Sequence, residues 1–364
     1  MVTIEGTCDP RFEGVREVFA QNWDLFDETG ASVAVTVDGE PVVDLWGGWS
    51  DAARTRPWER DTIVVVASTT KGLTGLCGNM LIDRGQLDPD APVATYWPEF
   101  AENGKEGVLV KHLFDHTAGL PNMPRDVPAS DWFGVVDALA AKRPRWVPGT
   151  AHNYHAATYG YLIGEVVRRV TGVTIGTYAR REVCEPLGVD FWIGVPPELD
   201  DRCAEVCGAG AGGFDSVALR RYESPGGNGH TNGRSLARIW GALACGGEVD
   251  GVRLISKQIL DDAMSTEVTG PWVGFDESML EPDGPIPRST FGLRFARGWM
   301  RSSEMSWMGP NSGAFGSAGS GGSIAVADPD ARLGFGYAQN SHLGPLAGVG
   351  SRPGRVLQAV YDLL

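Results

Sequence analysis

Apolar positions recur with a helical period at the start of the chain and with a strand period soon afterwards. After Asp9 and a first-turn proline, apolar side chains at helical spacing predict an N-terminal helix. Two β-rich runs, 32–37 and 42–46, lie on either side of a turn and predict an antiparallel hairpin. A third apolar run, 63–67, predicts a strand that leads directly into a long buried helix beginning at Ser68.

The later part of the chain changes from helices back to strands. The middle shows mostly helical periods separated by long loops that contain glycine and proline. Strands are predicted again over 323–327 and 333–340, and a final helix closes the chain. This order predicts an α+β fold, in which one antiparallel sheet built from both chain ends is flanked by helices, plus a mostly helical lobe. We predict an α/β domain from 1–84 and 286–364, and a helical domain from 85–285.

Composition and charge exclude two classes of partner. The 364 residues are 42% hydrophobic and 21% charged, which is typical of a soluble globular protein of about two domains. The net charge of −15 repels phosphate backbones and anionic lipid surfaces, so we expect no nucleic acid and no membrane partner. The longest strongly apolar run is far shorter than the roughly 20 residues of a membrane-spanning helix. The first residues are acidic and do not resemble a secretory signal, so we expect a cytoplasmic protein.

Histidine and cysteine spacing does not indicate a metal site. His112 and His116 lie four residues apart, but the glutamate of a His-Glu-x-x-His motif is missing. Cys203 and Cys207 lack the further ligands that zinc requires. The six cysteines are scattered, which favours free thiols over a disulfide framework. We therefore expect no metal and no other cofactor.

A serine nucleophile is indicated at the start of the predicted long helix. The Gly-x-Ser-x-Gly elbow of α/β-hydrolases does not occur in the sequence, whereas Ser68 and Lys71 form a Ser-x-x-Lys motif. Three residues along a helix place both side chains on one face, and the helix start stabilises negative charge near the hydroxyl. The alternative is that Ser68 only caps the helix and Lys71 is solvated. A lysine is unfavourable beside a positive helix start, which argues against that alternative.

Further motifs follow in an order that resembles a known superfamily. After Ser-x-x-Lys come His-Thr-Ala-Gly-Leu at 116–120, Pro-Gly-Thr at 148–150, Tyr154, and Tyr-Gly-Tyr-Leu-Ile-Gly at 159–164. Segments 227–232, 234–238 and 315–340 extend the match over nearly the whole chain. The ordered set resembles the serine β-lactamase and penicillin-binding-protein superfamily. Within it, the chain is similar to class C β-lactamases and, more closely, to family VIII carboxylesterases.

This resemblance implies roles for three side chains and two backbone groups. It makes Ser68 the nucleophile, Lys71 its partner and Tyr154 the third catalytic group. A phenol is a poor base at neutral pH, but an adjacent lysine ammonium favours the phenolate, and burial lowers the pKa of the lysine itself. The implied oxyanion donors are the backbone N–H groups of Ser68 and Ser320. His155, next to the tyrosine, is expected to be a pocket or supporting residue.

Two departures from the β-lactamase pattern favour an esterase. Ala156 stands where β-lactamases have the asparagine of Tyr-x-Asn. Ser317, Ala318 and Gly319 replace the Lys-Thr-Gly of β-lactamases and the His-x-Gly of many esterases, within a glycine-rich strand expected over 316–322. No cation therefore meets a substrate carboxylate at this strand. These three residues, together with the histidine after the catalytic tyrosine, are our candidates for substrate contact.

We therefore expect a serine hydrolase that cleaves small, neutral, short-chain carboxylic esters through an acyl-enzyme on Ser68. The same three side chains also serve an acyltransferase, in which an alcohol or amine replaces water. A β-lactamase or D-amino-peptidase-like amide hydrolase and a non-catalytic binding protein are the remaining alternatives.

Overall fold

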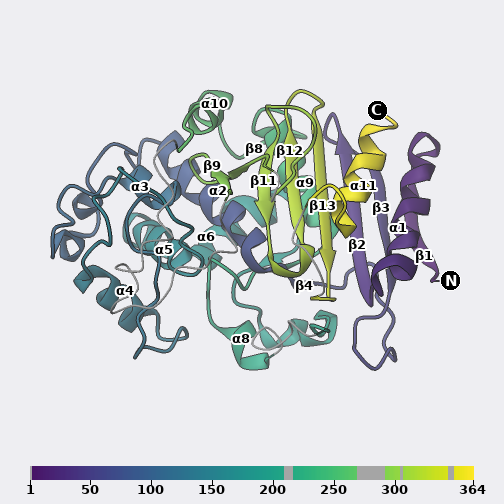
Figure 1. The fold of residues 1–364 in the computed structure, drawn as a ribbon, viewed down its shortest axis with the longest axis horizontal. Coiled ribbons are helices and arrows are strands. Elements are labelled where there is room, and N and C mark those ends of the chain that lie inside the picture. The colour runs from purple at the N-terminus through teal and green to yellow at the C-terminus, as the bar shows by residue number, and fades with distance from the viewer. Residues whose placement is uncertain (1, 209–215, 269–291, 304–305, 343–347) are drawn as a thin grey trace.

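The structure is a computed structural model that describes residues 2–208, 216–268, 292–303, 306–342 and 348–364. Its central feature is an antiparallel sheet with helices on both faces and a mostly helical lobe at one side (Figure 1). Within the described residues, the sheet has eight strands, which are β1 (Ile4–Cys8), β2 (Gly30–Val37), β3 (Glu40–Gly48), β9 (Arg294–Phe295), β10 (Met300–Arg301), β11 (Phe315–Ala318), β12 (Ile324–Asp328) and β13 (Leu333–Gln339). Their order is β1-β3-β2-β13-β12-β11-β10-β9. The predicted α+β fold is confirmed.

Strands from the two ends of the chain meet in the middle of this sheet. β2 pairs antiparallel with β13, with Val33 opposite Tyr337. The predicted hairpin is confirmed as β2 and β3, and its turn residues Asp38 and Gly39 have φ values of 53° and 84°. A two-residue hairpin turn of this type requires positive φ, which aspartate and glycine adopt more readily than most residues. The turn is shorter than the predicted one because β3 already begins at Glu40.

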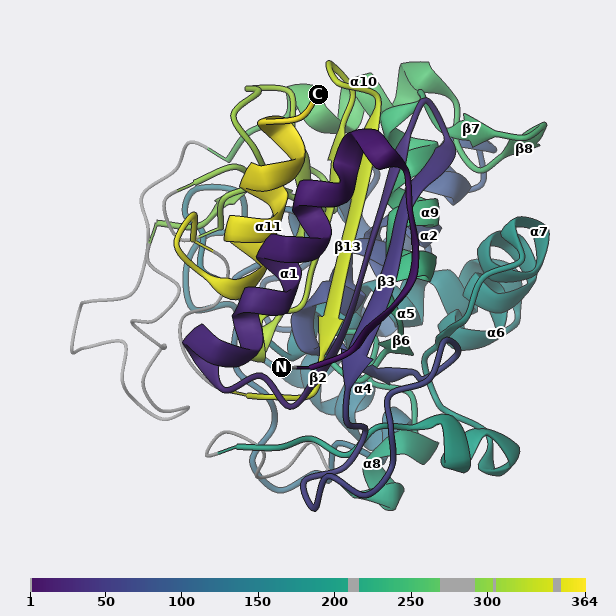
Figure 2. The ribbon, with the colours of Figure 1, turned by 90° about the vertical axis from the view of Figure 1, so that its right-hand side faces the viewer.

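The two terminal helices cover one face of the sheet. α1 (Glu13–Phe26) and α11 (Arg352–Tyr361) lie side by side on this face (Figure 2). Phe19 of α1 and Leu357 of α11 join Val33 and Phe335 of the sheet in one buried apolar cluster. Burial of these side chains fixes both helices on the sheet and explains the helical periods read at the two chain ends.

α9 (Gly233–Ala244) covers the opposite face, where it packs against β2, β12 and β13. β13 has Gly334 and Gly336 on this face, and a Cβ atom at either position would collide with the backbone of α9. α9 lies within 85–285, the segment predicted to form a helical domain, but the sheet is its neighbour. The period of a helix can be read from sequence, whereas the surface that buries its apolar face cannot. The predicted boundary between 285 and 286 lies outside the described residues.

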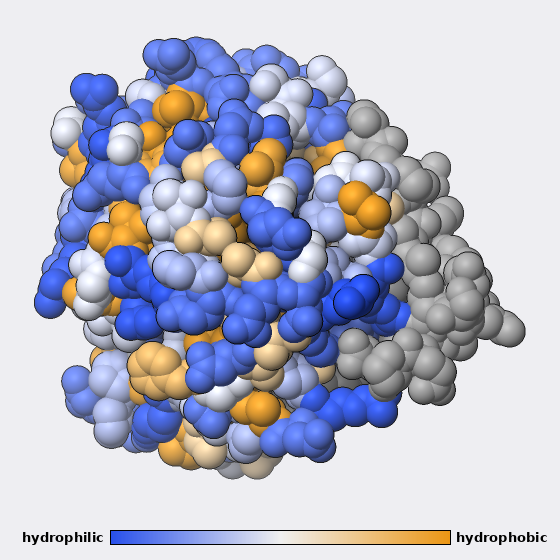
Figure 3. Space-filling model, turned by 90° about the vertical axis from the view of Figure 1, so that its left-hand side faces the viewer, coloured by the Kyte–Doolittle hydropathy of each residue, from blue (hydrophilic) through white to orange (hydrophobic). Residues whose placement is uncertain are grey.

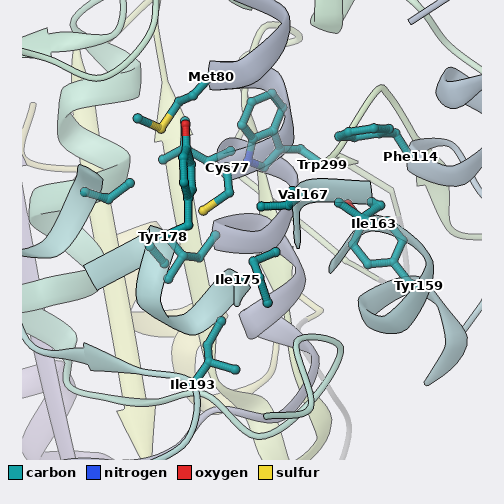
Figure 4. Packing of buried hydrophobic residues seen from close by; sticks show 14 of the residues in the cluster. Cys77, Met80, Phe114, Tyr159, Ile163, Val167, Ile175, Tyr178, Ile193 and Trp299 are labelled. Atoms are coloured by element: carbon teal, nitrogen blue, oxygen red, sulfur yellow. The ribbon is translucent and has the colours of Figure 1, made fainter. Parts of the chain in front are cut away.

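A long buried helix, α2 (Thr70–Asp83), runs between the sheet and the helical lobe. The other helices are α3 (Val110–Phe114), α4 (Trp132–Ala141), α5 (Thr158–Thr171), α6 (Ile175–Ala179), α7 (Glu185–Leu187), α8 (Val217–Arg221) and α10 (Lys257–Ser265). In the core of the lobe, Cys77 and Met80 of α2 lie among side chains from α5 and α6 such as Val167 and Tyr178 (Figure 4). α2 is therefore held from all sides, which makes its first turn a rigid place for a reactive group.

The apolar run 63–67 forms less strand than predicted. Its strand is β4 (Val64–Val65), which joins β6 (His230–Thr231) and β5 (Phe191–Trp192) in a separate small sheet. After β4 the chain turns at Ala67, whose φ is 44°. The run is apolar because it is buried, and it stops being extended because it must turn into α2. A second small hairpin joins β7 (Glu248–Val249) and β8 (Val252–Arg253).

The surface of the helical lobe is mixed in character. On the described part of the face shown in Figure 3, apolar residues are scattered among hydrophilic ones. Phe133 and Val147 are among the more exposed, at 61% and 70%, and single exposed apolar residues of this kind are usual on folded proteins. Among the described residues, no helix combines the length and apolar character needed to cross a membrane.

Candidate active site

Ser68 and Lys71 meet at the beginning of α2. Ser68 lies in the 3₁₀ turn Ala67–Thr69, and Lys71 Nζ is 3.1 Å from its Oγ atom. Lys71 Nζ also donates a hydrogen bond of 2.5 Å to the carbonyl of Gly226. Burial, which disfavours the charged form, lowers the pKa of Lys71 to about 7. A large fraction of this amine is therefore unprotonated at neutral pH and can accept the proton of the serine hydroxyl.

The backbone on both sides of Ser68 is tightly held. Ala67 has a φ of 44°, which is rare for a residue with a Cβ atom and is typical of strained positions in functional sites. The side chain of Thr70 donates to the carbonyl of Ala67 at 2.6 Å and accepts from the N–H of Gly229 at 2.9 Å. Ser323 Oγ donates to the carbonyl two residues before the nucleophile, at 2.7 Å. These contacts from distant segments keep the strained turn in place.

Tyr154 lies beside the lysine. Lys71 Nζ is 4.9 Å from the centroid of the Tyr154 ring, and the ring stacks on Phe295 with centroids 5.8 Å apart. Among the described residues, the Tyr154 hydroxyl has no hydrogen-bond partner of standard geometry. Burial raises the pKa of Tyr154 above its ordinary value, and the nearby hydroxyl of Ser68 opposes this shift less strongly. In the resting site the phenol is therefore protonated, so the phenolate expected from the sequence is not the resting form.

His116 holds the backbone on both sides of the tyrosine. The N–H of Asn153 donates to the His116 carbonyl at 3.3 Å, and the N–H of His155 donates to His116 Nδ1 at 3.1 Å. The His116 ring also contacts the Tyr154 ring, with centroids 5.1 Å apart. Burial lowers the pKa of His116 well below its ordinary value, so the ring is neutral and Nδ1 accepts. The motif at 116–120 is the sequence signal for this role, but the backbone groups that His116 binds cannot be predicted from it.

His155 supports the site from behind and is not placed to contact a substrate. Its Nε2 atom accepts from the N–H of Leu120 at 2.9 Å, and its Nδ1 atom lies 2.7 Å from the carbonyl of Asn153. Burial lowers the pKa of His155 to about 4. Both ring nitrogens of this neutral imidazole are therefore occupied by backbone groups. His155 is therefore not a substrate-contact residue. It joins two loops, which agrees with the other role expected from the sequence, that of a supporting residue.

β11 passes the nucleophile on the side of the sheet. A Cβ atom on Gly319 would collide with the carbonyl of Val66 and lie 3.1 Å from the backbone nitrogen of Ser68. This close approach requires glycine. Ala318 is buried in the cluster on the other face of the sheet, and the strand ends there. The expectation of a continuous strand over 316–322 is therefore wrong beyond Ala318, because the chain forms the 3₁₀ turn Ser320–Gly322.

Ser317 faces α2 and is 2% exposed. A Cβ atom on Gly72 would lie 2.5 Å from its hydroxyl oxygen, so the two segments touch at this point. A cavity of about 10 Å³ borders Ser317, Lys71 and His116, which is close to the smallest volume that holds one water molecule. The side chain at 317 is thus a neighbour of the catalytic lysine, not part of an open surface.

The two candidate oxyanion donors lie in the first turns of two short helices. Ser68 is in the turn Ala67–Thr69, and Ser320, which is exposed, begins the turn Ser320–Gly322. Backbone N–H groups in a first helical turn have no partner within the helix and can bind an anionic oxygen. In the part of the chain that the structure describes, no group of three His, Cys, Asp or Glu side chains is placed to hold a metal ion, and the cysteines form no disulfide.

Comparisons with known proteins identify the family of this chain. A family model described as "Beta-lactamase" matches residues 15–358. The esterase/β-lactamase LipL of Mycobacterium tuberculosis is 34% identical over 380 aligned positions, which cover 94% of this chain and 84% of LipL. The crystal structure of a penicillin-binding-protein homologue from Caulobacter crescentus has a TM-score of 0.88 and 37% identity, and covers 100% of both chains. That of a family VIII carboxylesterase has a TM-score of 0.86 and 36% identity, with the same coverage. The chain therefore belongs to the β-lactamase family of serine hydrolases.

Proposed function

We propose that this protein is an esterase that transfers the acyl group of a small, neutral carboxylic ester first to Ser68 and then to water. The observation that carries the proposal is the contact of 3.1 Å between Lys71 Nζ and Ser68 Oγ, made by a buried lysine whose pKa is lowered to about 7. A lysine in this state is a general base near the pH at which the enzyme would work. The serine beside it becomes a nucleophile without a histidine or a metal ion in the mechanism.

In the first half-reaction, Lys71 takes the proton of Ser68 as the serine Oγ atom attacks the ester carbonyl carbon. The carbonyl oxygen becomes an oxyanion, which the N–H groups of Ser68 and Ser320 bind. The bond to the alcohol oxygen then breaks, and the protonated phenol of Tyr154 gives its proton to this leaving oxygen. The Lys71 ammonium then gives a proton to the Tyr154 phenolate. The net result is that Lys71 and Tyr154 together have moved one proton from Ser68 to the leaving alcohol.

In the second half-reaction, water replaces the alcohol next to Tyr154. The Tyr154–Lys71 pair accepts a proton from this water as its oxygen attacks the acyl carbon. The bond from that carbon to Ser68 Oγ breaks, and the oxygen recovers a proton from Lys71. The acid leaves, and the three side chains are back in their starting protonation states.

The absence of a cation at position 317 supports a neutral ester as the substrate. Ser317 is an uncharged, buried neighbour of Lys71 and cannot form an ion pair with a substrate carboxylate. Position 317 therefore offers the carboxylate of a β-lactam or a peptide no charge-assisted hydrogen bond, an interaction worth roughly 1.5–3 kcal/mol. The relatives named as an esterase/β-lactamase and a family VIII carboxylesterase support ester hydrolysis as the reaction, and the first of these names includes β-lactam hydrolysis as well.

The test compares the hydrolysis of p-nitrophenyl butyrate with that of nitrocefin by the purified protein. We expect kcat/KM for the ester to exceed that for the β-lactam by about tenfold or more. Comparable turnover of nitrocefin would contradict the assignment to neutral esters. Product analysis with added butanol shows whether water or an alcohol accepts the acyl group, and butyl butyrate as the main product would replace hydrolysis with acyl transfer.

A further inference from the structure

The turn that carries Ser320 is bound by side chains from the end of β13 and the start of α11. Within this turn, the carbonyl of Gly321 accepts a hydrogen bond of 2.6 Å from Gln339 Nε2 and a second from the guanidinium group of Arg352. Arg352 lies at the start of α11 and is 3% exposed. Its guanidinium also pairs with the carboxylate of Glu28, at 2.8 Å. The Gly321 carbonyl is thus bound by a neutral and a charged donor, both fixed in the protein interior.

Two peptide units connect this carbonyl to the N–H group of Ser320. The carbonyl of Gly321 and the N–H of Gly322 belong to one peptide unit, and this N–H donates to the carbonyl of Gly319 at 3.0 Å. The carbonyl of Gly319 in turn shares a peptide unit with the N–H of Ser320. Hydrogen bonds in such a series polarise one another, and the positively charged guanidinium of Arg352 is one of the two donors at its start. Each hydrogen bond in this series makes the Ser320 N–H a stronger and better oriented donor.

We propose that Gln339 and Arg352 are positioning residues that orient and polarise the Ser320 N–H for binding the oxyanion. This inference rests on the proposed function, because it takes Ser320 as an oxyanion donor. Neither side chain touches the substrate in this role. Both act through the peptide units of the turn, so their effect falls on the transition state and not on binding of the ground state.

The environment of Gln339 argues against a purely stabilising role for this residue. Gln339 is 1% exposed, and among the described residues its Oε1 atom has no hydrogen-bond partner. A buried unpaired carbonyl destabilises a protein, because it has given up its hydrogen bonds to water without replacing them. An apolar side chain of the same length would avoid this penalty. The amide therefore adds a donor to Gly321 at a position where stability alone favours an apolar residue.

Gln339→Met tests the proposal because it removes the donor and the unpaired oxygen together while keeping the length of the side chain. We expect an unchanged or higher Tm, a fall in kcat of roughly three- to tenfold, and a KM within about twofold of the wild type. Loss of an oxyanion donor itself costs about 10²–10³ in kcat, so loss of a group that supports the donor must cost less. The matched control is Gln358→Met on α11, which removes a surface hydrogen bond to Asp362. We expect this variant to keep the wild-type kcat.

Binding of phenylboronic acid gives a second readout that a structural role would not move. Its boron forms an anionic tetrahedral adduct with a serine oxygen and places one of its hydroxyl oxygens where the oxyanion forms. The inhibition constant should rise in Gln339→Met by about the factor by which kcat falls. Arg352→Lys should lower both kcat and Tm, because it also disturbs the buried pair with Glu28.

Three results distinguish failure of the positioning role from failure of the proposed function. A Gln339→Met variant with wild-type kcat and wild-type boronate affinity would overturn the positioning role, while esterase activity that is lost in Ser68→Ala would still support the proposed function. A variant that loses stability and activity together, in proportion, would also overturn it. Absence of Ser68-dependent ester hydrolysis in the wild type would overturn both proposals.

Discussion

Ser68 and Lys71 are joined locally, whereas Tyr154 and Ser320 are held by partners far away in the chain. The contact between Ser68 and Lys71 spans three residues at the start of a helix. Tyr154 is held through His116, whose Nδ1 atom binds the backbone of a residue 39 positions later. The turn that begins with Ser320 is bound by Arg352 of α11. One half of the site therefore depends on helix geometry and the other half on tertiary packing.

This difference determines which substitutions affect chemistry alone. A change at Ser68 or Lys71 removes a reacting group from a helix that the core already holds on all sides. A change at His116 removes backbone contacts that place another residue, so it acts through geometry. Variants of the two halves should therefore differ both in the size of their effect and in whether a conservative replacement restores activity.

Ser68→Ala should have the largest effect. It removes the atom that forms the acyl intermediate, and we expect kcat for p-nitrophenyl butyrate to fall by at least about 10⁴. The side chain makes few stabilising contacts beyond Lys71, so Tm should stay near the wild-type value. Steady-state kinetics and thermal unfolding of the same preparation measure both. Residual activity within tenfold of the wild type would show that another residue is the nucleophile.

His116 variants test the half of the site that depends on tertiary contacts. His116→Leu removes the acceptor for the His155 N–H and places a branched side chain at a φ of 65°, so kcat should fall by roughly 10- to 100-fold. His116→Asn should restore much of this loss, because asparagine adopts positive φ readily and its Oδ1 atom can replace the Nδ1 acceptor. Equal activity of the leucine and asparagine variants, at matched Tm, would contradict the role given to this histidine.

The pH dependence of kcat/KM distinguishes Lys71 from the Tyr154 phenolate as the general base. Catalysis needs unprotonated Lys71, whose pKa is about 7, so kcat/KM should rise with pH and reach its plateau above pH 8. At pH 6 it should be about tenfold below that plateau. The pKa of His155 is lowered to about 4 and that of His116 lies well below 6.5, so neither titrates in this interval. A midpoint above pH 10 would instead indicate the Tyr154 phenolate, because burial raises the pKa of this phenol above its ordinary value.

Ser317→Ala should have the smallest effect. The Ser317 hydroxyl faces Gly72 in the interior, so its loss should leave KM for a neutral ester within about twofold of the wild type. The corresponding measurement is a comparison of KM for p-nitrophenyl butyrate in the two proteins. A KM at least tenfold higher would show that the hydroxyl binds substrate and would return position 317 to the substrate pocket.

The sequence predicted those parts of the molecule that depend on neighbours close in the chain. The hairpin of β2 and β3, the helix after Ser68 and the sheet built from both ends all follow from period and turn residues. The placement of α9 on the sheet could not be read in this way. It depends on Gly334 and Gly336, which let two backbones approach, and glycine in a sequence does not say what approaches it.

In the candidate site, too, contacts between residues close in the sequence could be predicted, whereas contacts between distant residues could not. Ser-x-x-Lys gave the contact between Ser68 and Lys71, and the family motifs drew attention to Tyr154. The roles of His116 and Gln339 depend on hydrogen bonds to backbone atoms of distant residues. A sequence pattern does not show which distant residues come into contact. The protonated resting state of the Tyr154 phenol is likewise not readable from the sequence, because burial raises its pKa more than the nearby hydroxyl of Ser68 lowers it.

The most direct test of the central claim is to find which atom carries the acyl group. The protein is treated with a p-nitrophenyl phosphonate, digested, and analysed by peptide mass spectrometry. We predict one adduct per chain, located on the peptide that contains Ser68 and lost in Ser68→Ala. A single adduct on Ser320 or Ser323 instead, with Ser68 unmodified, would contradict the account.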